Sequence, residues 1–458
     1  MSDFLITDFG ARECDKMQTV EIQAALDACF LAGGGRVIIP CGVFHTGGLR
    51  LRSNTILYLK SGAILRGSRN PDDYLSYLDD EIEPIVEPTF PAAKMLKGGS
   101  HPFSRWNSGL IKVISAKNVS IIGEQGSYID GRDCFDHIGE AKFRGPHAIN
   151  IFDTESIYLE GYTVIDSANW AHNIFCSKNI TVRNIKVLGG HDGFDVRTCD
   201  NILVEDSTFL TGDDCIAGFD NKCVVIRNCI MDSACSVFRF GGTDVLIENC
   251  KATSPASYGF RRDLDADERR LGMLPTEKCR HTTHTVFQYY CDFRAEIRYT
   301  PGNIIIKNCE FKNTNSLFLH LYDGMHKWCT NRPLTSIVFE DTEIMGLSLA
   351  GVLCSDSKEP LVFKMKNCFV SSREDEAEFP IFEAKNCKEI VLDGVTVRGF
   401  KKPTVVTDNK NIISIKNSDD IEVTEKADFE FSNPYVEASG DKAEQAIFAK
   451  EKAVQNIN

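Results

Sequence analysis

Four aspartates stand in two short segments near the middle of the chain, Gly190-His-Asp-Gly-Phe-Asp195 and Thr211-Gly-Asp-Asp-Cys215. When like charges are held close together, at least one carboxyl takes up a proton while the others remain ionised. This division into acid and base is what cleavage of a glycosidic bond requires. Calcium binding also uses clustered carboxylates, and aspartates serve as turn caps or on a solvated acidic face. The spacing alone does not decide among these chemistries.

A repeat of about 22 residues predicts how the two segments meet. Each copy has a polar first residue, apolar residues at offsets 1 and 3, a turn pair, and apolar or small residues at offsets 6 and 8. Alternation of this kind is typical of strands, and so short a unit must stack on the next copy to bury its apolar face. Leucine-rich repeats have the same period, but their signature is absent. The copies begin at Ser156, Asn179, Asn201, Cys223, Asp244, Asn303, Ser336, Val362 and Glu389.

These repeats predict an all-β fold, a single-stranded parallel β-helix in which equivalent positions of successive coils lie about 4.8 Å apart. Stacking then places His191 and Asp192 beside Asp213 and Asp214. Adjacent aspartates on a regular strand face opposite ways, so we expect a bend or bulge at Gly212 that turns both toward an open groove. The cysteines at offset 6 are expected in the interior, where a free thiol behaves as a small apolar group: Cys229, Cys250, Cys309 and Cys368.

The ends of the stack are expected to be capped. Residues 19–31 have helical periodicity, which predicts a capping helix within an N-terminal cap of residues 1–50. We expect one domain over residues 1–425, with inserted loops at 81–106 and 257–298. Residues 426–458 are expected to form a C-terminal tail.

Composition excludes several classes of function. The net charge of −14 argues against a phosphate-binding surface for nucleic acid. Apolar runs are far shorter than a membrane helix requires, so no membrane partner is expected. The N-terminus lacks a secretory pattern, which predicts a cytoplasmic protein with its 18 cysteines reduced. No CxxC pair occurs, and we expect neither a metal nor a cofactor.

Both aspartate motifs resemble those of glycoside hydrolase family 28, the polygalacturonase-like pectin hydrolases. The resemblance spans roughly residues 4–367, including ITDFGARECDKMQTVEIQAALDAC and RGPHAINIF. The family's Asn-Thr-Asp and Gly-Asp-Asp motifs match at Asp192 and at Gly212, Asp213 and Asp214. The resemblance implies a right-handed parallel β-helix and hydrolysis with inversion, in which Asp213 is the general acid. Asp192 and Asp214 would then activate the water.

The chain also departs from the family pattern. Gly190 and His191 replace the usual Asn-Thr, and the histidine of a Gly-His-Gly motif falls on Cys235. These departures argue against simple polygalacturonan as the substrate. Arginine suits bidentate recognition of a sugar carboxylate. The alternatives are that Arg239 forms a structural ion pair with Asp195, and that the other arginines, including Arg197, are surface charges. Trp170 could equally be a core residue. The residues predicted to bind substrate are His191, Asp195, Arg239, Arg261, Arg262 and Trp170.

The sequence therefore predicts an inverting glycoside hydrolase acting on uronic-acid-containing oligosaccharides derived from pectin, either galacturonan or rhamnogalacturonan. Attack from the chain end is expected, because a cytoplasmic enzyme meets only short imported chains. The alternatives are a calcium-dependent lyase or epimerase on the same scaffold, and a carbohydrate-binding β-helix without activity. The expected partner is an oligosaccharide.

Overall fold

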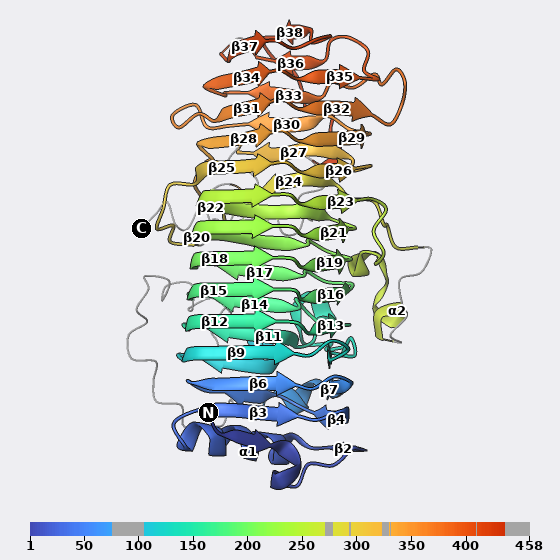
Figure 1. Ribbon diagram of the computed structural model, residues 1–458. Coiled ribbons are helices and arrows are strands. Elements are labelled where there is room, and N and C mark those ends of the chain that lie inside the picture. The colour runs from blue at the N-terminus through green and yellow to red at the C-terminus, as the bar shows by residue number, and fades with distance from the viewer. Residues whose placement is uncertain are drawn as a thin grey trace, which may run out of the picture. The chain divides into compact units, whose positions relative to one another are not determined.

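The computed structural model describes residues 1–75, 105–270, 278–292, 295–322, 329, 331–408 and 410–435. Contacts divide the chain into two compact units, and each is built from short parallel strands (Figure 1). The first unit comprises Met1–Ala217, Val225–Ala234 and Ala256–His281. The second comprises Gly218–Val224, Cys235–Pro255 and Thr282–Asn458. The expectation of a single domain over residues 1–425 stays a prediction.

In the first unit, the parallel strands form three series. Two of the series belong to one sheet, and the third belongs to a second sheet. One series is β1 (Asp3–Leu5), β3 (Gly35–Ile39), β6 (Thr55–Leu59), β9 (Lys117–Gly123), β12 (Glu155–Glu160), β15 (Lys178–Arg183) and β18 (Asp200–Glu205). The next is β5 (Leu49–Leu51), β8 (Gly109–Ile114), β11 (His147–Phe152), β14 (His172–Phe175) and β17 (Phe194–Arg197). The other sheet contains β2 (Cys14–Met17), β4 (Gly42–Thr46), β7 (Ala63–Gly67), β10 (Tyr128–Asp130), β13 (Thr163–Ile165), β16 (Lys186–Gly189), β19 (Thr208–Thr211) and β21 (Ile230–Ser233).

The second unit repeats this arrangement. Its larger sheet contains β22 (Ser236–Glu248), β24 (Thr285–Tyr289), β25 (Gly302–Lys307), β27 (Ser316–Leu321), β28 (Ser336–Glu340), β30 (Gly351–Cys354), β31 (Val362–Lys366), β33 (Phe382–Lys385), β34 (Glu389–Asp393), β36 (Val405–Thr407), β37 (Ile412–Lys416) and β38 (Val423–Glu425). The smaller contains β23 (Lys251–Thr253), β26 (Glu310–Lys312), β29 (Glu343–Leu347), β32 (Phe369–Ser372) and β35 (Thr396–Arg398). Strand β20 (Ile216–Arg227) contributes residues to both units.

The predicted all-β parallel β-helix is confirmed, and it is right-handed, as parallel crossover connections almost always are. The polar residues of the repeat form the bends between strands. Asn179, Asn184 and Asn201 have φ values of 58°, 50° and 59°, a left-handed conformation that asparagine tolerates better than most residues. Asn201 Nδ2 also donates a hydrogen bond to Asn179 Oδ1, at 3.0 Å, which aligns two successive coils.

The interior is formed by alternate strand residues stacked from coil to coil. Ile180 pairs in register with Ile202, and Val182 with Val204, and all four are at most 2% exposed. The expected interior position of the four repeat cysteines is confirmed, because each is at most 3% exposed. None of the 18 cysteines is joined in a disulfide.

The predicted capping helix is α1 (Thr19–Leu31), and it packs on β1, β3 and β5. Its buried residues are Ile22, Ala25, Leu26 and Cys29. Strands β1 and β2 also pair with the following strands β3 and β4. The bounds of the N-terminal cap, residues 1–50, stay a prediction. No helix among the described residues is long and apolar enough to cross a membrane.

The expected insertions are partly corrected. Strand β24 lies inside the expected loop 257–298 and pairs with β22 and β27, so it belongs to a coil. Before it stand the short helices η7 (Arg261–Asp263) and α2 (Ala266–Arg270). Of the loop 81–106, only the end is described, where helix η5 (Arg105–Asn107) lies. The part of the tail over residues 436–458 lies outside the described residues.

Candidate active site

The aspartates lie in stacked turns that connect the strands of the two sheets. Residues 190–193 join β16 to β17, and residues 212–215 join β19 to β20. The backbone N–H of Gly212 donates to the carbonyl of Gly189 at 2.9 Å, and that of Gly193 donates to the carbonyl of Asp214 at 2.9 Å. The predicted bend at Gly212 is confirmed. Asp213 and Asp214 therefore lie in a turn beside the turn of Asp192, and neither is part of a strand.

Two glycines allow these turns to pack closely. A Cβ atom on Gly212 would lie 2.2 Å from the carbonyl oxygen of Gly259, and one on Gly190 would lie 2.3 Å from Arg261 Nε. Both distances are far below van der Waals contact, so a side chain on Gly212 would displace the backbone, and one on Gly190 would displace the Arg261 side chain. The close packing brings the segment of Arg261 against the aspartate turns.

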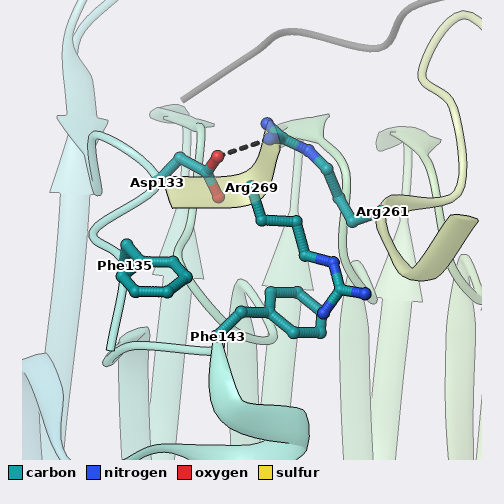
Figure 2. A pocket seen from close by; sticks show the side chains of 5 residues that line it. All are labelled: Asp133, Phe135, Phe143, Arg261 and Arg269. Atoms are coloured by element: carbon teal, nitrogen blue, oxygen red, sulfur yellow. Dashed lines mark hydrogen bonds and ion pairs between the residues drawn. The ribbon is translucent and has the colours of Figure 1, made fainter. Parts of the chain in front are cut away.

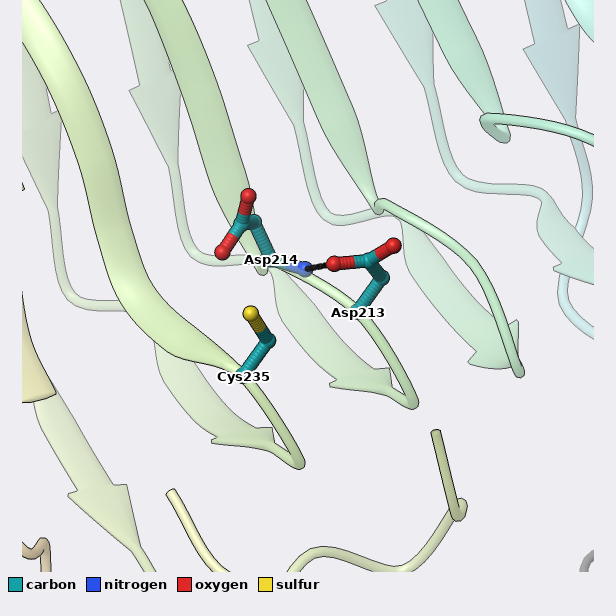
Figure 3. A group of neighbouring side chains, drawn as sticks. All are labelled: Asp213, Asp214 and Cys235. Atoms are coloured by element: carbon teal, nitrogen blue, oxygen red, sulfur yellow. Dashed lines mark hydrogen bonds between the residues drawn. The ribbon is translucent and has the colours of Figure 1, made fainter. Parts of the chain in front are cut away.

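The three aspartates are more buried than the open groove of the sequence prediction implies. Asp192 is 3% exposed, Asp213 is 8% exposed and Asp214 is 1% exposed. A buried carboxylate requires a partner, and Arg144 supplies one, because its Nη2 lies 2.7 Å from Asp213 Oδ2. Figure 3 shows the backbone N–H of Asp214 donating to Asp213 Oδ1, at 3.2 Å. These contacts hold Asp213 in place from two sides.

Asp192 has a different environment from Asp213. Burial, followed by the negative charges of Asp213 and Asp214, raises the pKa of Asp192 well above its ordinary value. Its buried Oδ1 has no hydrogen-bond partner among the residues that the structure describes. The three aspartates, hereafter the trio, therefore combine two kinds of carboxyl. That of Asp192 favours its protonated form, and that of Asp213 is paired to a cation.

His191 belongs to a second set of charged groups beside the trio. Its Nε2 lies 3.7 Å from Asp133 Oδ1, and Asp133 Oδ2 also pairs with Arg261 Nη1 (Figure 2). Burial lowers the pKa of His191 below its ordinary value. Burial also opposes ionisation of Asp133, yet the contacts with His191 and Arg261 hold the pKa of that carboxyl below its usual range. At neutral pH this set contains a neutral imidazole between charged neighbours.

A small pocket adjoins this set. Figure 2 shows Asp133 and Arg261 joined on one side of it and the ring of Phe143 with the Arg269 side chain on the other. The guanidinium carbon of Arg269 lies 4.3 Å from the centroid of the Phe143 ring, within the range of a cation–π contact. The pocket has a charged side and an aromatic side. Its lining residues are Asp133, Phe135, Phe143, Arg261 and Arg269.

Asp195 and Trp170 form a third group, together with Arg197. Asp195 Oδ1 lies 2.9 Å from Arg197 Nε, so its ion pair within the first unit is with this arginine. The guanidinium carbon of Arg197 lies 4.8 Å from the ring centroid of Trp170 and 5.5 Å from that of Trp106. The alternative that Arg197 is a surface charge is wrong, because the residue is only 7% exposed.

The remaining predicted residues are not brought into these groups by any described contact within the first unit. Arg262 is exposed on helix η7. Arg239 lies in the second unit, where its guanidinium carbon is 4.3 Å from the ring centroid of Tyr290. The substrate-binding roles of all six predicted residues stay predictions.

Sequence reasoning missed Arg144, Asp133 and Trp106. Arg144 is the first residue of the segment RGPHAINIF and directly precedes Gly-Pro and a strand. The rest of the segment has no ionisable side chain except a histidine. That isolated cation was the available signal. Asp133 and Trp106 belong to connections outside the repeat, and the local sequence contains no signal that places them near the aspartates.

Stacked parallel coils with a buried group of carboxylates in adjoining turns define a parallel β-helix protein with a candidate acid–base site. Residues 95–236 match the model of glycosyl hydrolases family 28, and this segment includes all three aspartates. This segment of the chain is therefore similar to glycosyl hydrolases of family 28.

Relatives are similar over only part of their length. A probable polygalacturonase of Vitis vinifera is 27% identical over 194 residues, which is 40% of this chain and 37% of that protein. An exo-poly-alpha-D-galacturonosidase of Dickeya chrysanthemi is 26% identical over 259 residues, covering 46% of this chain and 41% of that protein. The chain thus spans about two fifths of the length of these curated relatives.

A solved structure is similar over most of the chain. The family 28 exopolygalacturonase of Yersinia enterocolitica superposes with a TM-score of 0.53 at 17% identity, covering 92% of this chain and 78% of that one. At this identity the similarity shows the fold alone.

Proposed function

We propose that the protein is an inverting glycoside hydrolase that cleaves uronic-acid-containing oligosaccharides derived from pectin, either galacturonan or rhamnogalacturonan. The observation that carries the proposal is the gathering of Asp192, Asp213 and Asp214 in two adjoining turns, inside the segment that matches family 28. A cytoplasmic location is part of the proposal.

The trio supplies the groups that the reaction needs. One carboxyl donates a proton to the glycosidic oxygen, and a carboxylate removes a proton from the water that attacks the anomeric carbon from the opposite face. By family resemblance Asp213 is the acid, and Asp192 and Asp214 activate the water. His191, Asp195, Trp170, Arg239, Arg261 and Arg262 are proposed to bind substrate.

A calcium-dependent lyase is the weaker candidate. A calcium site needs carboxylate oxygens that are available to the cation. Asp213 Oδ2 is already paired with the guanidinium of Arg144 at 2.7 Å, and the arginine is itself buried. Arg144 thus provides the positive charge that a calcium ion would otherwise provide to this carboxylate.

The products of oligosaccharide cleavage test the proposed function. The protein is incubated with oligogalacturonides and rhamnogalacturonan oligosaccharides, and the products are followed by NMR as they form. We expect saturated products whose new reducing end first appears with the anomeric configuration opposite to that of the cleaved bond, unaffected by a chelator. Unsaturated, chelator-sensitive products would instead identify a lyase, and binding without turnover would identify a carbohydrate-binding protein.

Attack from the chain end is supported by helix η5, which covers the outer face of a ladder leading to Asp195. Lys112 pairs in register with Asn150, Asn150 with Asn173, and Asn173 with Asp195. Asn150 Nδ2 donates to the carbonyl of Asn107 at 2.5 Å, so η5 lies directly on this ladder. Any sugar chain bound along the ladder would have to displace the helix.

Trp106 extends this cover toward the aspartate turns. Its ring meets that of Trp170 edge to face, with centroids 5.2 Å apart, and Trp170 lies in the turn between β13 and β14, one coil before the turn of Asp192. Coils are spaced by about 4.8 Å, roughly the length of one sugar residue. The contact between Trp106 and Trp170 therefore leaves little room for sugar units on the side of the site that faces the preceding coil.

Replacing Trp106 with alanine is therefore expected to change the pattern of products. Wild-type protein should release one size of short product from the start, whereas Trp106→Ala should release a mixture of lengths, measured by chromatography of early time points. Trp106→Phe keeps an aromatic ring and should keep the wild-type pattern. An unchanged pattern in folded Trp106→Ala would show that this residue does not restrict the binding site.

A further inference from the structure

We propose that residues 429–435, here called the strap, close the outer face of the second unit to long sugar chains, and that Tyr435 is a specificity-determining residue at which a bound chain must end. The proposal rests on the proposed hydrolase function, and it narrows the substrate class to short oligosaccharides rather than polymers. The strap follows β38, the last strand, and returns across earlier coils of the same unit.

The outward side chains of one ladder in the second unit change from polar to apolar along the stack. In register, this ladder contains Arg239, Gln288, Leu319, Val352 and Glu383. Their side chains point outward, because strand residues alternate and the adjacent Phe287 and Phe318 stack inside the coils with ring centroids 5.6 Å apart. Arg239 and Gln288 are partly exposed, whereas Leu319 and Val352 are 7% and 0% exposed. The apolar part of this outer face is therefore covered.

Phe431 of the strap covers the apolar part. It packs on a cluster of four residues from β27 and β30, which are Leu319, Leu321, Val352 and Cys354. The ring of Phe429 meets that of Phe431 edge to face, with centroids 5.6 Å apart. Lys385 Nζ lies 4.5 Å and 5.2 Å from the centroids of these two rings, within the range of cation–π contacts. The strap thus occupies the face along which a longer sugar chain would have to lie.

Hydrogen bonds to buried groups hold the strap in place. The backbone N–H of Ser432 donates to Glu383 Oε2 at 2.7 Å, and the Glu383 residue is 6% exposed. Asn433 is 1% exposed, and its Nδ2 donates to the carbonyl of Ala350 at 2.7 Å. Displacing the strap would leave these buried polar groups without their partners, which is costly. A sugar chain therefore does not displace the strap easily.

Tyr435 stands where the covered part of the face meets the uncovered part. Its ring stacks on the imidazole of His284, with centroids 3.9 Å apart and planes at 25°, and its hydroxyl accepts a hydrogen bond from Asn315 Nδ2 at 3.3 Å. His284 directly precedes β24, the strand whose Gln288 pairs with Arg239 of β22. The stacked rings therefore form a wall beside the polar end of the ladder.

The partly exposed positions of Arg239 and Gln288 offer room for only a short chain. They lie on neighbouring coils, and coils are spaced by about 4.8 Å, so the two positions match the length of about two sugar units. A chain that extends farther meets the wall of Tyr435 and His284. Affinity is therefore expected to rise with chain length until these positions are filled, and then to stop rising.

Binding of oligosaccharides of increasing length tests the proposal. Oligogalacturonides and rhamnogalacturonan oligosaccharides of defined length are titrated by calorimetry into Asp213→Asn, which preserves them during the titration, and into the same protein with Tyr435→Ala. We expect the affinity of Asp213→Asn to reach its plateau at a short length. Tyr435→Ala should move the plateau to chains longer by at least one sugar unit and bind them several-fold more tightly. A plateau at the same length in both proteins would overturn the proposal.

Two controls separate the wall from a structural role of the strap. Tyr435→Phe keeps the ring on His284 and should keep the plateau. Phe400→Ala removes a ring from another aromatic pair of the same unit, in which Phe379 and Phe400 have centroids 5.5 Å apart, and it should not move the plateau. An equal shift in Phe400→Ala would contradict the proposal. If Tyr435→Ala does not fold, His284→Ala removes the other ring of the wall and must lengthen the plateau, or the proposal is wrong.

The outcomes for the strap and for the hydrolase are distinguishable. Length-dependent binding as expected, without cleavage by the wild-type protein, would overturn the hydrolase and leave the role of Tyr435 correct. Cleavage to saturated products with a plateau that ignores Tyr435→Ala would overturn the role of Tyr435 alone. Absence of binding by every oligosaccharide would overturn both.

Discussion

Asp213→Asn is expected to lower kcat/KM by about 10²–10⁴-fold on every oligosaccharide that the wild-type protein cleaves, since positioned acid or base groups contribute rate factors of this size. The substitution keeps the shape of the side chain but removes both its negative charge and its ability to exchange a proton. The loss is expected whether Asp213 acts as acid or as base, because neither role is available to an amide. The measurement is initial rates under conditions where the variant is shown to be folded by circular dichroism.

Asp206→Asn is the control for this experiment. Asp206 is exposed, has a φ of 53° in a bend of the same unit, and accepts a hydrogen bond from Asn228 Nδ2 at 2.9 Å. Asparagine tolerates this conformation as well as aspartate does, so activity should not change. Activity of Asp213→Asn within a few-fold of wild type would exclude this residue from the chemistry.

Arg144→Met is expected to lower the free energy of unfolding by about 3–5 kcal/mol, the usual result when one partner of a buried ion pair is removed. Methionine fills part of the volume of arginine but leaves Asp213 buried without its cation. The Asp213 side chain is 12% exposed, so water replaces the lost partner only in part. Chemical denaturation monitored by circular dichroism measures the change.

The matched control removes an arginine from an exposed ion pair of the same unit. Arg36 Nη2 lies 2.7 Å from Asp3 Oδ2, the same distance as in the buried pair, but the two side chains are 34% and 47% exposed. Arg36→Met should therefore change the free energy of unfolding by only about 0–1 kcal/mol. Equal effects of the two substitutions would show that Arg144 and Asp213 are not a buried pair in solution.

Much of the fold could be predicted from the sequence because its determinants are local. Alternating apolar residues define strands, and asparagine or aspartate at fixed offsets defines the bends, so the period of about 22 residues contains the geometry of one coil. The helix over residues 19–31 was predicted with the bounds that the structure has. Strand β24 was missed, since its coil follows a long insertion that interrupts the period.

The meeting of Asp192 with Asp213 and Asp214 was also determined by the sequence alone, because stacking brings equivalent offsets of successive coils together. The partners of these aspartates were decided only by the tertiary structure. Arg144 reaches Asp213 across 69 residues, and Arg261 reaches Asp133 across 128. Each contact involves at least one segment outside the repeat, whose position depends on how the connections pack over the coils. The repeat therefore placed the carboxylates, whereas long-range packing decided their burial and the charges that they face.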